Sequence, residues 1–392
     1  MGKIDFLKEA LGIKEEVIKL RRDFHEHPEL DYDLFRTCEK VKEFLKNEGI
    51  EYYDTASTGV CAIIRGNGSK TVAIRGDMDA LPIQEKNVCD YSSKVEGKMH
   101  ACGHDAHTAI LLGTAKVLNS IKDDLKGNVK LLFEPAEETT GGAKVMIKEG
   151  VLKEPEVDAV IGLHMEEKID IGKIGLNRGV VNAASNPFVI KIKGKGAHGA
   201  RPNDSVDPIV IASNVVMALQ TIVSRELPPT DPRVLTIGTI NGGTADNIIP
   251  DEVTLKGTIR VMETEHRKYV TKRLKEIVEG ICKGMRAECE VSVKENYPCL
   301  HNNNEMLDKF IDSAKGIIGE NNIQMLEKPS MGVESFAYFS MEKPSVFYYL
   351  GCRNEEKGII HPAHSNLFDI DEDSLSLGVA LHCKAAFDIL NS

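Results

Sequence analysis

The sequence has no excess of positive charge. It contains 49 lysines and arginines against 60 aspartates and glutamates, and its net charge is −11. A surface that binds phosphates needs surplus lysine and arginine, so nucleic acid is excluded as a partner. No apolar run approaches the length of a membrane span, and the charged N-terminal residues lack the apolar stretch of a signal peptide. We therefore expect no membrane association.

The cysteines lack the pattern of a disulfide framework. There are nine, an odd number, and they are scattered through the sequence, which is typical of reduced thiols and favours a cytoplasmic location. The sequence also lacks internal repeats and low-complexity tracts. Its 392 residues exceed what one ordinary core accommodates, so we expect two domains.

What the sequence does have is a dense cluster of polar groups at residues 100–107 (HACGHDAH). One thiol, three imidazoles and a carboxylate lie within these eight residues, and a helical pattern follows at 106–118. Taken singly, each histidine is more often structural than a metal ligand, and Cys102 is more often a small buried apolar residue. Only convergence with donors elsewhere in the chain favours a metal site.

Three apolar runs end in side chains that can supply such donors. The run at 71–75 is followed by GDMD, the run at 129–133 by EPAEE, and the run at 159–163 by His164. Helical patterns separate them, which predicts an α/β fold with a mostly parallel central sheet and helices on both faces. The ligand crevice of such a sheet lies beyond the carboxyl ends of its strands. We also expect runs 60–65 and 71–75 to form a hairpin across the turn GNGS.

Residues 186–296 follow a different pattern. Expected strands at 188–193, 234–240, 253–261 and 289–293 and expected helices at 208–227 and 265–285 give the order βαββαβ, that of a ferredoxin-like sandwich. The sequence therefore predicts a catalytic domain formed by residues 1–185 and 297–392, and an inserted domain at 186–296.

The candidate metal ligands are one thiolate, three imidazoles and one carboxylate. Cys102 and His104 lie on one turn, and Glu138, His164 and His364 come from three other segments. Five donors can hold two ions about 3.5–4 Å apart if one donor bridges them. This set suits zinc, manganese, cobalt or nickel rather than magnesium or calcium.

The adjacent acids Glu137 and Glu138 have two interpretations. A solvated acidic turn is the simpler one, but the pair follows a wholly apolar strand and precedes two glycines. One carboxylate can bind metal while its neighbour takes a proton from water, as metal-assisted hydrolysis requires. Asp79 is a candidate for orienting a ligating imidazole.

Eight motifs spread over nearly the whole chain carry a family resemblance. The sequence resembles the amidohydrolase branch of the aminoacylase/carboxypeptidase G/dipeptidase family of di-metal hydrolases. That branch includes hippurate hydrolases, N-acyl-amino-acid hydrolases, N-acetyldiaminopimelate deacetylases and indole-acetyl-amino-acid hydrolases. The motifs are RRDFHEHPEL, RGDMDALPI, MHACGHDAHTAILLG, EPAEE, GLHM, GKGAHGARPNDSVDP, ADNIIPDEVTLKGTIR and AHSNLFDID.

The resemblance implies roles for the site residues of the catalytic domain. Glu137 would be the general base and Asp79 the acid behind the site, and Cys102 would bridge two divalent ions. The implied metal ligands are Cys102, His104, Glu138, His164 and His364.

The resemblance also implies a homodimer formed through the inserted domain. His198 would reach the neighbouring subunit's site and polarise the scissile carbonyl, while Asn247 and Arg260 would hold the substrate carboxylate, a role that suits a guanidinium fork. Without the resemblance, a solvated loop histidine between glycines is the simpler interpretation of His198.

Two positions depart from the family pattern. Ser335 stands where the family usually has aspartate, which removes one acid from what we expect to be the pocket wall, and Leu34 stands where an acid is common. We expect both departures to affect substrate preference rather than chemistry.

We interpret the chain as a cytosolic metal-dependent amidohydrolase that cleaves N-acyl amino acids with acetyl or aryl acyl groups. The alternative with the same machinery is a dipeptidase or aminoacyl exopeptidase. A non-catalytic relative would have lost a ligand or the base, and all are present. A hydrolase that uses Cys102 as its nucleophile would work in the presence of a chelator. The sequence leaves the acyl group and the metal open.

Overall fold

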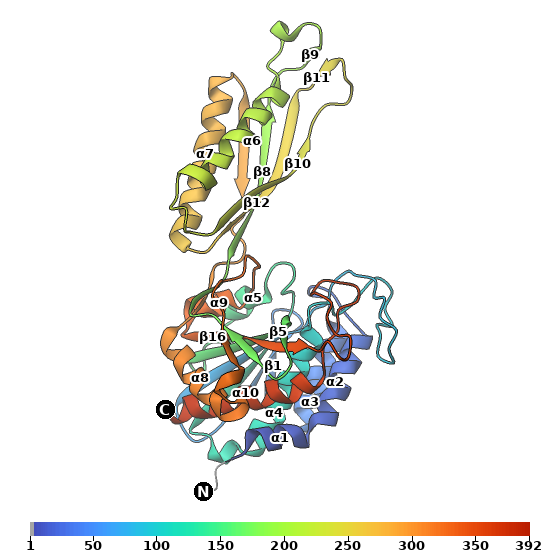
Figure 1. The fold of residues 1–392 in the computed structure, drawn as a ribbon, viewed down its shortest axis with the longest axis vertical. Helices are drawn as coiled ribbons and strands as arrows, with labels where there is room; N and C mark the ends of the chain where they lie inside the picture. The colour runs from blue at the N-terminus through green and yellow to red at the C-terminus, as the bar shows by residue number, and fades with distance from the viewer. Residues whose placement is uncertain (1–3) are drawn as a thin grey trace. The chain divides into compact units, whose positions relative to one another are not determined.

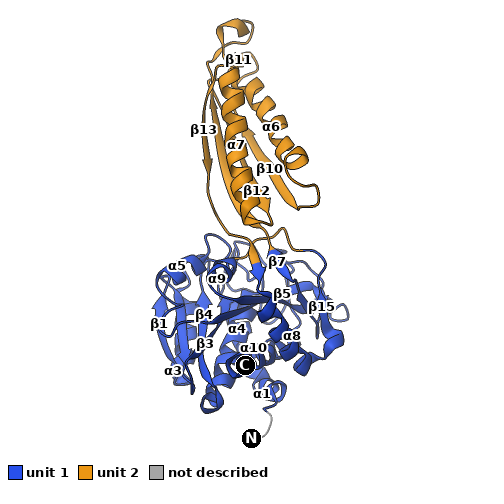
Figure 2. Ribbon diagram, turned by 90° about the vertical axis from the view of Figure 1, so that its left-hand side faces the viewer, with its two compact units in different colours: residues 1–181, 301–328, 335–392 blue, residues 182–300, 329–334 orange. Residues whose placement is uncertain are grey.

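The computed structural model describes residues 4–392, which divide into two units (Figure 2). Among the described residues, unit 1 comprises 4–181, 301–328 and 335–392, and unit 2 comprises 182–300 and 329–334. Unit 2 is thus an insertion into unit 1, with a short second segment near residue 330.

The elements have the following bounds (Figure 1). The α-helices are α1 (Phe6–Gly12), α2 (Lys14–Glu26), α3 (Phe35–Asn47), α4 (His104–Ser120), α5 (Gly142–Lys148), α6 (Pro208–Arg225), α7 (Thr264–Gly284), α8 (Asn304–Ile318), α9 (Ala337–Glu342) and α10 (Asp373–Asn391). The strands are β1 (Glu51–Thr55), β2 (Gly59–Ile64), β3 (Lys70–Asp77), β4 (Gly127–Glu134), β5 (Ala159–Asp170), β6 (Ile174–Leu176), β7 (Gly179–Asn182), β8 (Ala184–Lys193), β9 (Ala197–His198), β10 (Arg233–Asn241), β11 (Ile248–Ile249), β12 (Glu252–Val261), β13 (Glu288–Val293), β14 (Leu300–Asn302), β15 (Ile323–Met325) and β16 (Ser345–Arg353). Short 3₁₀ turns lie at Lys122–Asp124, Pro202–Asp204 and Glu320–Asn322.

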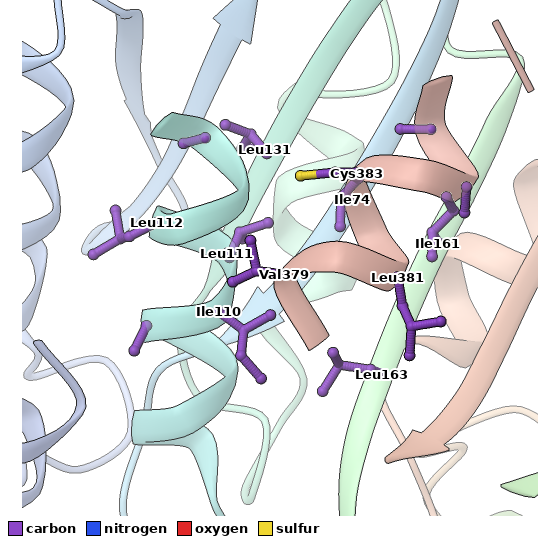
Figure 3. Close-up of a cluster of buried hydrophobic side chains, with 14 of the residues drawn as sticks. Ile74, Ile110, Leu111, Leu112, Leu131, Ile161, Leu163, Val379, Leu381 and Cys383 are labelled. Carbon is purple, nitrogen blue, oxygen red and sulfur yellow. The ribbon is translucent and has the colours of Figure 1, made fainter. Parts of the chain in front are cut away.

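An eight-stranded sheet forms the centre of unit 1, in the order β1-β2-β4-β3-β5-β16-β6-β15. Strands β4, β3, β5 and β16 run parallel. The side chain of Ile74 on β3 packs towards α4 and α10 (Figure 3). Its neighbour Arg75 points to the opposite face, where it bonds to Ser335 just before α9. Helices therefore cover both faces, and the predicted α/β class with a mostly parallel sheet is confirmed.

The predicted hairpin between runs 60–65 and 71–75 is wrong. Strand β4 lies between them, antiparallel to β2 and parallel to β3, while β2 forms its hairpin with β1, a strand the sequence analysis missed. The turn GNGS crosses the start of β4, where the Asn67 amide donates to Leu125 O at 2.7 Å. A Cβ on Gly66 would lie 2.3 Å from Gly127 O, so this close crossing requires glycine.

A continuous apolar core fixes α4 on the sheet. Leu131 and Ile161 of the strands, Leu111 of α4 and Val379 of α10 are fully buried and pack together (Figure 3). Because α4 begins at His104, this packing holds the start of the helix, and the polar cluster before it, at the carboxyl ends of the central strands.

Unit 2 is a four-stranded antiparallel sheet, in the order β10-β12-β8-β13, with α6 and α7 packed on it. The order and the βαββαβ connections are those of the predicted ferredoxin-like sandwich. Among residues 4–392, α6 is the one helix long and apolar enough to cross a membrane. Its buried side, which includes Ile211, Val215 and Leu219, faces the core of unit 2.

Candidate metal centre

All five predicted metal ligands lie in unit 1, and the structure brings them together in two overlapping groups. The donor atoms of Cys102, His104 and His164 lie within 4.8 Å of one another, and so do those of Cys102, Glu138 and His364. Cys102 belongs to both groups, as a ligand that bridges two ions must.

The thiol and the imidazole of His164 face each other across a short gap. Cys102 Sγ lies 3.3 Å from His164 Nε2, and His164 Nδ1 lies 2.6 Å from Met165 O. A carbonyl oxygen can only accept, so Nδ1 carries the proton and the lone pair of Nε2 points towards the thiol. Gly103, with φ of 89°, gives the left-handed turn that sets Cys102 and His104 on one side.

His104 is fully buried, and neither of its ring nitrogens has a hydrogen-bond partner among the described residues. Its Nδ1 lies 3.3 Å from Asp79 Oδ1, and its Nε2 lies 3.6 Å from Asp77 Oδ2 and 3.9 Å from Glu138 Oε1. Burial alone would lower the pKa of His104, but the charge of Asp77 and the interaction with the neighbouring Cys102 sulfur raise that pKa well above its ordinary value. The site attracts a positive charge at this position.

Glu138 and His364 form the other side of the centre. Glu138 Oε1 lies 3.4 Å from His364 Nε2. Burial would raise the pKa of Glu138, but its contact with His364 and the charge of His104 lower that pKa. The same contact with Glu138 raises the pKa of His364. Both shifts favour the charged forms, so Glu138 and His364 attract each other in the metal-free protein, and His364 must release its proton before it can bind an ion.

The donor set fits a pair of soft or borderline divalent ions. Burial, and then the charge of Glu138, raises the pKa of the Cys102 thiol well above its ordinary value, so the thiolate is unfavourable here without a nearby cation. The imidazole nitrogens of His104 and Oε1 of Glu138 are buried without hydrogen bonds among residues 4–392. Thiolate, imidazole and carboxylate together suit zinc, manganese, cobalt or nickel.

Asp79 fixes the two adjacent acids of the site. Its Oδ1 accepts from the Glu137 amide at 2.9 Å, and its Oδ2 accepts from the Glu138 amide at 3.0 Å. Burial raises the pKa of Asp79. Because the same carboxylate also lies against His104, Asp79 links the base segment to a candidate ligand.

Ser335, at the position that departs from the family pattern, contacts the candidate base Glu137. It is fully buried, and its amide donates to Glu137 Oε1 at 3.0 Å. Its hydroxyl donates to Glu134 Oε1 at 2.6 Å and accepts from Arg75 at 2.8 Å. The departure from the family pattern therefore lies at the support of the base, while Leu34 is a core residue.

Asp77 and His107 are part of the centre, although the sequence analysis gave them no role. Asp77 lies 2.6 Å from both Arg75 Nη1 and His107 Nδ1. Burial would raise the pKa of Asp77, but the charges of Arg75 and His104 lower it well below the ordinary value. Burial lowers the pKa of His107 to about 4. The motif GDMD contained the signal, because it places two acids at the end of one strand.

The backbone is strained beside two of the functional groups. Ala136, just before the acid pair, has φ of 57°, and His364 has φ of 64°. Non-glycine residues in this region cost about 1–3 kcal/mol each and persist where the surrounding structure imposes them. Here Ala136 precedes the candidate base Glu137 and His364 is a candidate ligand, so the strain lies at the candidate centre.

The three predicted site residues of unit 2 do not come together. His198 on β9 pairs with Ile248 on β11, and the Gly199 amide donates to Asn247 O at 2.7 Å, so His198 and Asn247 share one end of the unit (Figure 1). Arg260 lies near the other end of β12, about 26 Å along the strand from its first residue at 3.3 Å per residue. Its Nη1 is buried without a hydrogen bond among the described residues, and burial lowers the pKa of Arg260.

The sequence matches the profile of peptidase family M20/M25/M40 over residues 73–388. It is 40% identical over 385 residues to thermostable carboxypeptidase 2 of Saccharolobus solfataricus, covering 97% of this chain and 96% of the relative. It is 40% identical over 366 residues to N-acetyl-L-cysteine deacetylase of Bacillus subtilis, covering 93% of this chain and 85% of the relative. The crystal structure of the Bacillus subtilis YXEP protein, described as a dinuclear metal binding peptidase from the M20 family, superposes with a TM-score of 0.83 at 33% identity, covering 97% of this chain and 99% of that one.

Asp79→Asn should lower the free energy of unfolding of the metal-free protein by about 1–3 kcal/mol, because one carboxamide oxygen replaces two acceptors and leaves a buried amide unpaired. Urea unfolding measures this change. Asp90→Asn, at an exposed position, is the matched control and should change the value by at most about 0.5 kcal/mol. Equal effects of the two substitutions would contradict the role assigned to Asp79.

Proposed function

This chain belongs to peptidase family M20/M25/M40 and is a hydrolase of amide bonds, and from that premise we propose that it is a two-metal amidohydrolase of N-acyl amino acids. The observation that carries the proposal is the pair of donor groups that share Cys102. A base, Glu137, lies next to the ligand Glu138, as the division between proton transfer and ion binding requires.

The side chains of unit 1 have separate tasks in the proposed reaction. The five donors would hold two divalent ions, whose Lewis acidity would lower the pKa of water and polarise the scissile carbonyl. Glu137 accepts the proton of the attacking water and returns it to the leaving nitrogen. The Ser335 amide holds Glu137 Oε1, and Asp79 holds the Glu137 amide, so the carboxylate keeps one orientation during both transfers.

His198 is suited to stabilise the oxyanion. The Ala200 amide donates to His198 Nδ1 at 3.0 Å, so the proton of the neutral ring resides on Nε2. That nitrogen is exposed and can donate to an oxygen on which negative charge develops.

The N-acyl amino acid is the substrate class that the relatives favour. The deacetylase of Bacillus subtilis is named for an N-acetyl amino acid, and Arg260 offers a guanidinium for a substrate carboxylate. The alternative, a dipeptidase or exopeptidase with the same machinery, is favoured by the carboxypeptidase of Saccharolobus solfataricus. The nine cysteines, all unpaired, support a cytoplasmic location.

A substrate screen tests this function. Protein stripped of metal with a chelator should be inactive, and zinc, manganese, cobalt or nickel should restore hydrolysis of N-acetyl, N-benzoyl or indole-acetyl amino acids, measured as release of free amino acid. Dipeptides with a free amino group are the comparison set. Hydrolysis of dipeptides alone would favour the alternative. Full activity in chelator would contradict any role for metal and favour Cys102 as a nucleophile.

Glu137→Gln and Glu138→Gln should separate the two roles of the acid pair. Glu137→Gln should keep both ions by elemental analysis and lose a factor of about 10²–10⁴ in kcat, the usual contribution of a positioned general base. Glu138→Gln should bind less metal. Each substitution is the steric control of the other, and exchanged phenotypes would show that the assignments are reversed.

We further propose that each site is completed by a second subunit. Within one unit 2, His198 and Asn247 lie at one end and Arg260 near the other, so a single copy cannot bring all three to one small substrate. Two copies related by a two-fold axis can, because each contributes opposite ends to the two sites. This supports a homodimer formed through unit 2.

Mixing of inactive variants tests the shared site. His198→Ala and Glu137→Ala should each be nearly inactive alone. After dissociation and reassociation of an equal mixture, half of the dimers carry one of each chain, and roughly a quarter of all sites have both groups intact. Activity should recover to that level. The control mixture of Arg260→Ala with Glu137→Ala should recover none, because Arg260 serves the site of its own chain. Verified subunit exchange without recovery in the first mixture would contradict the shared site.

A further inference from the structure

The imidazole of His107 lies against the metal centre but has both nitrogens occupied. Its Nδ1 lies 2.6 Å from Asp77 Oδ1, and its Nε2 lies 2.9 Å from the amide nitrogen of Met165. The ring centroids of His107 and His164 are 4.9 Å apart. A histidine this close to a metal site invites assignment as a ligand, and its contacts with Asp77 and Met165 argue against that role.

The partner of Nε2 fixes the protonation of the ring. A backbone amide can only donate, so Nε2 of His107 must be the acceptor and the ring proton must reside on Nδ1, facing Asp77. Asp77 is in turn held by Arg75 at 2.6 Å. The result is a buried chain of contacts, Arg75–Asp77–His107–Met165, that has one arrangement of protons.

That chain ends on the residue that orients a proposed ligand. Met165 uses its N–H to reach His107 and its C=O to reach His164 Nδ1 at 2.6 Å. The peptide groups on either side of the Met165 Cα are therefore both held by imidazoles. A shift of the Met165 amide would change the direction of the His164 ring and of its Nε2 lone pair.

We propose that His107 is a positioning residue that aligns His164 for the ion shared with Cys102 and His104. This inference rests on the proposed two-metal function. It goes beyond that function because it proposes that His107, which is not a ligand, strengthens the binding of one of the two ions. Glu138 and His364, which would hold the other ion together with Cys102, make no hydrogen bond to His107 or Met165 among the described residues. Removing the contact between His107 and Met165 should therefore weaken the binding of one ion and leave the binding of the other unchanged.

Two substitutions separate the two contacts of His107. The carboxamide of glutamine reaches the place of Nε2, so His107→Gln keeps an acceptor for Met165. The carboxamide of asparagine reaches only the place of Nδ1, so His107→Asn keeps the contact to Asp77 and loses the one to Met165. Thr108→Val is the matched control, because the buried Thr108 hydroxyl donates to the Asp77 carbonyl oxygen at 2.9 Å and makes no hydrogen bond to Met165 among the described residues.

Titration of the metal-free proteins with cobalt(II), followed by visible absorption, gives both affinities without an activity assay. Thr108→Val should bind two ions, each with the same affinity as in the wild-type protein. His107→Asn should weaken the binding of one ion by about 10–100-fold, the usual effect of losing a residue that orients a ligand. The accompanying change in visible absorption should resemble the change that His164→Ala produces. His107→Gln should stay closer to wild type than His107→Asn.

Several results would overturn the inference. These are unchanged affinities in His107→Asn, equal losses in the asparagine and glutamine variants, or equal weakening of both ions. Wild-type protein that binds no cobalt would overturn the proposed function as well. Should His107→Asn fail to fold, NMR spectra of ring-¹⁵N-labelled wild-type protein test the proposal in the metal-free and zinc-loaded states. The signal of His107 is assigned as the one that is absent from the spectrum of His107→Gln. It must show Nδ1 protonated and Nε2 without a proton or metal in both states, and a protonated or zinc-bound Nε2 would contradict the proposal.

Discussion

Negative charge is concentrated in the buried region at the carboxyl ends of β3 and β4, and the groups around it must compensate that charge. The carboxylates concerned are Asp77, Asp79, Glu134, Glu137 and Glu138. An ion removed from water costs several kcal/mol unless partners compensate it. Arg75 compensates Asp77 and Glu134, and backbone amides compensate Asp79 only in part, since amides carry no net charge. The remaining deficit of positive charge lies where two ions are proposed, and the raised pKa of His104 reflects the same deficit.

The sequence predicted this convergence because it follows from local patterns. Apolar runs ending in GDMD, EPAEE and His164 predict parallel strands, and the ends of parallel strands meet at one edge. The order of the strands was not predictable in the same way. Insertion of β4 between β2 and β3 depends on pairings between residues 57 to 73 positions apart in the chain, and no local turn signal encodes those pairings. The contact of Ser335 with Glu137, 198 residues away, was inaccessible for the same reason.

Unit 2 separates two residues that the family resemblance assigns to one substrate carboxylate. Asn247 and Arg260 are close in the sequence, but β12 is an extended strand that separates them along its length. Extended structure converts a short sequence interval into a long distance. If Asn247 and Arg260 both act, they must serve two different sites or belong to two copies of the chain at one site. Their separation within one unit therefore supports the proposed homodimer.

Contacts outside the donor set hold the residues of the proposed two-metal centre in place. His164 is held through Met165, His104 through its burial beside Asp79, and Glu137 through Ser335, while Gly103, Ala136 and His364 adopt left-handed backbone conformations. A site that is rigid before an ion binds does not lose conformational entropy on binding, and it disfavours ions that prefer another geometry. Packing of α4 against the sheet supplies that rigidity, because the helix that carries His104 and His107 is buried along nearly its whole length. The same helix therefore contributes to the core and to the proposed centre. A substitution that disturbs the packing of α4 should also displace His104.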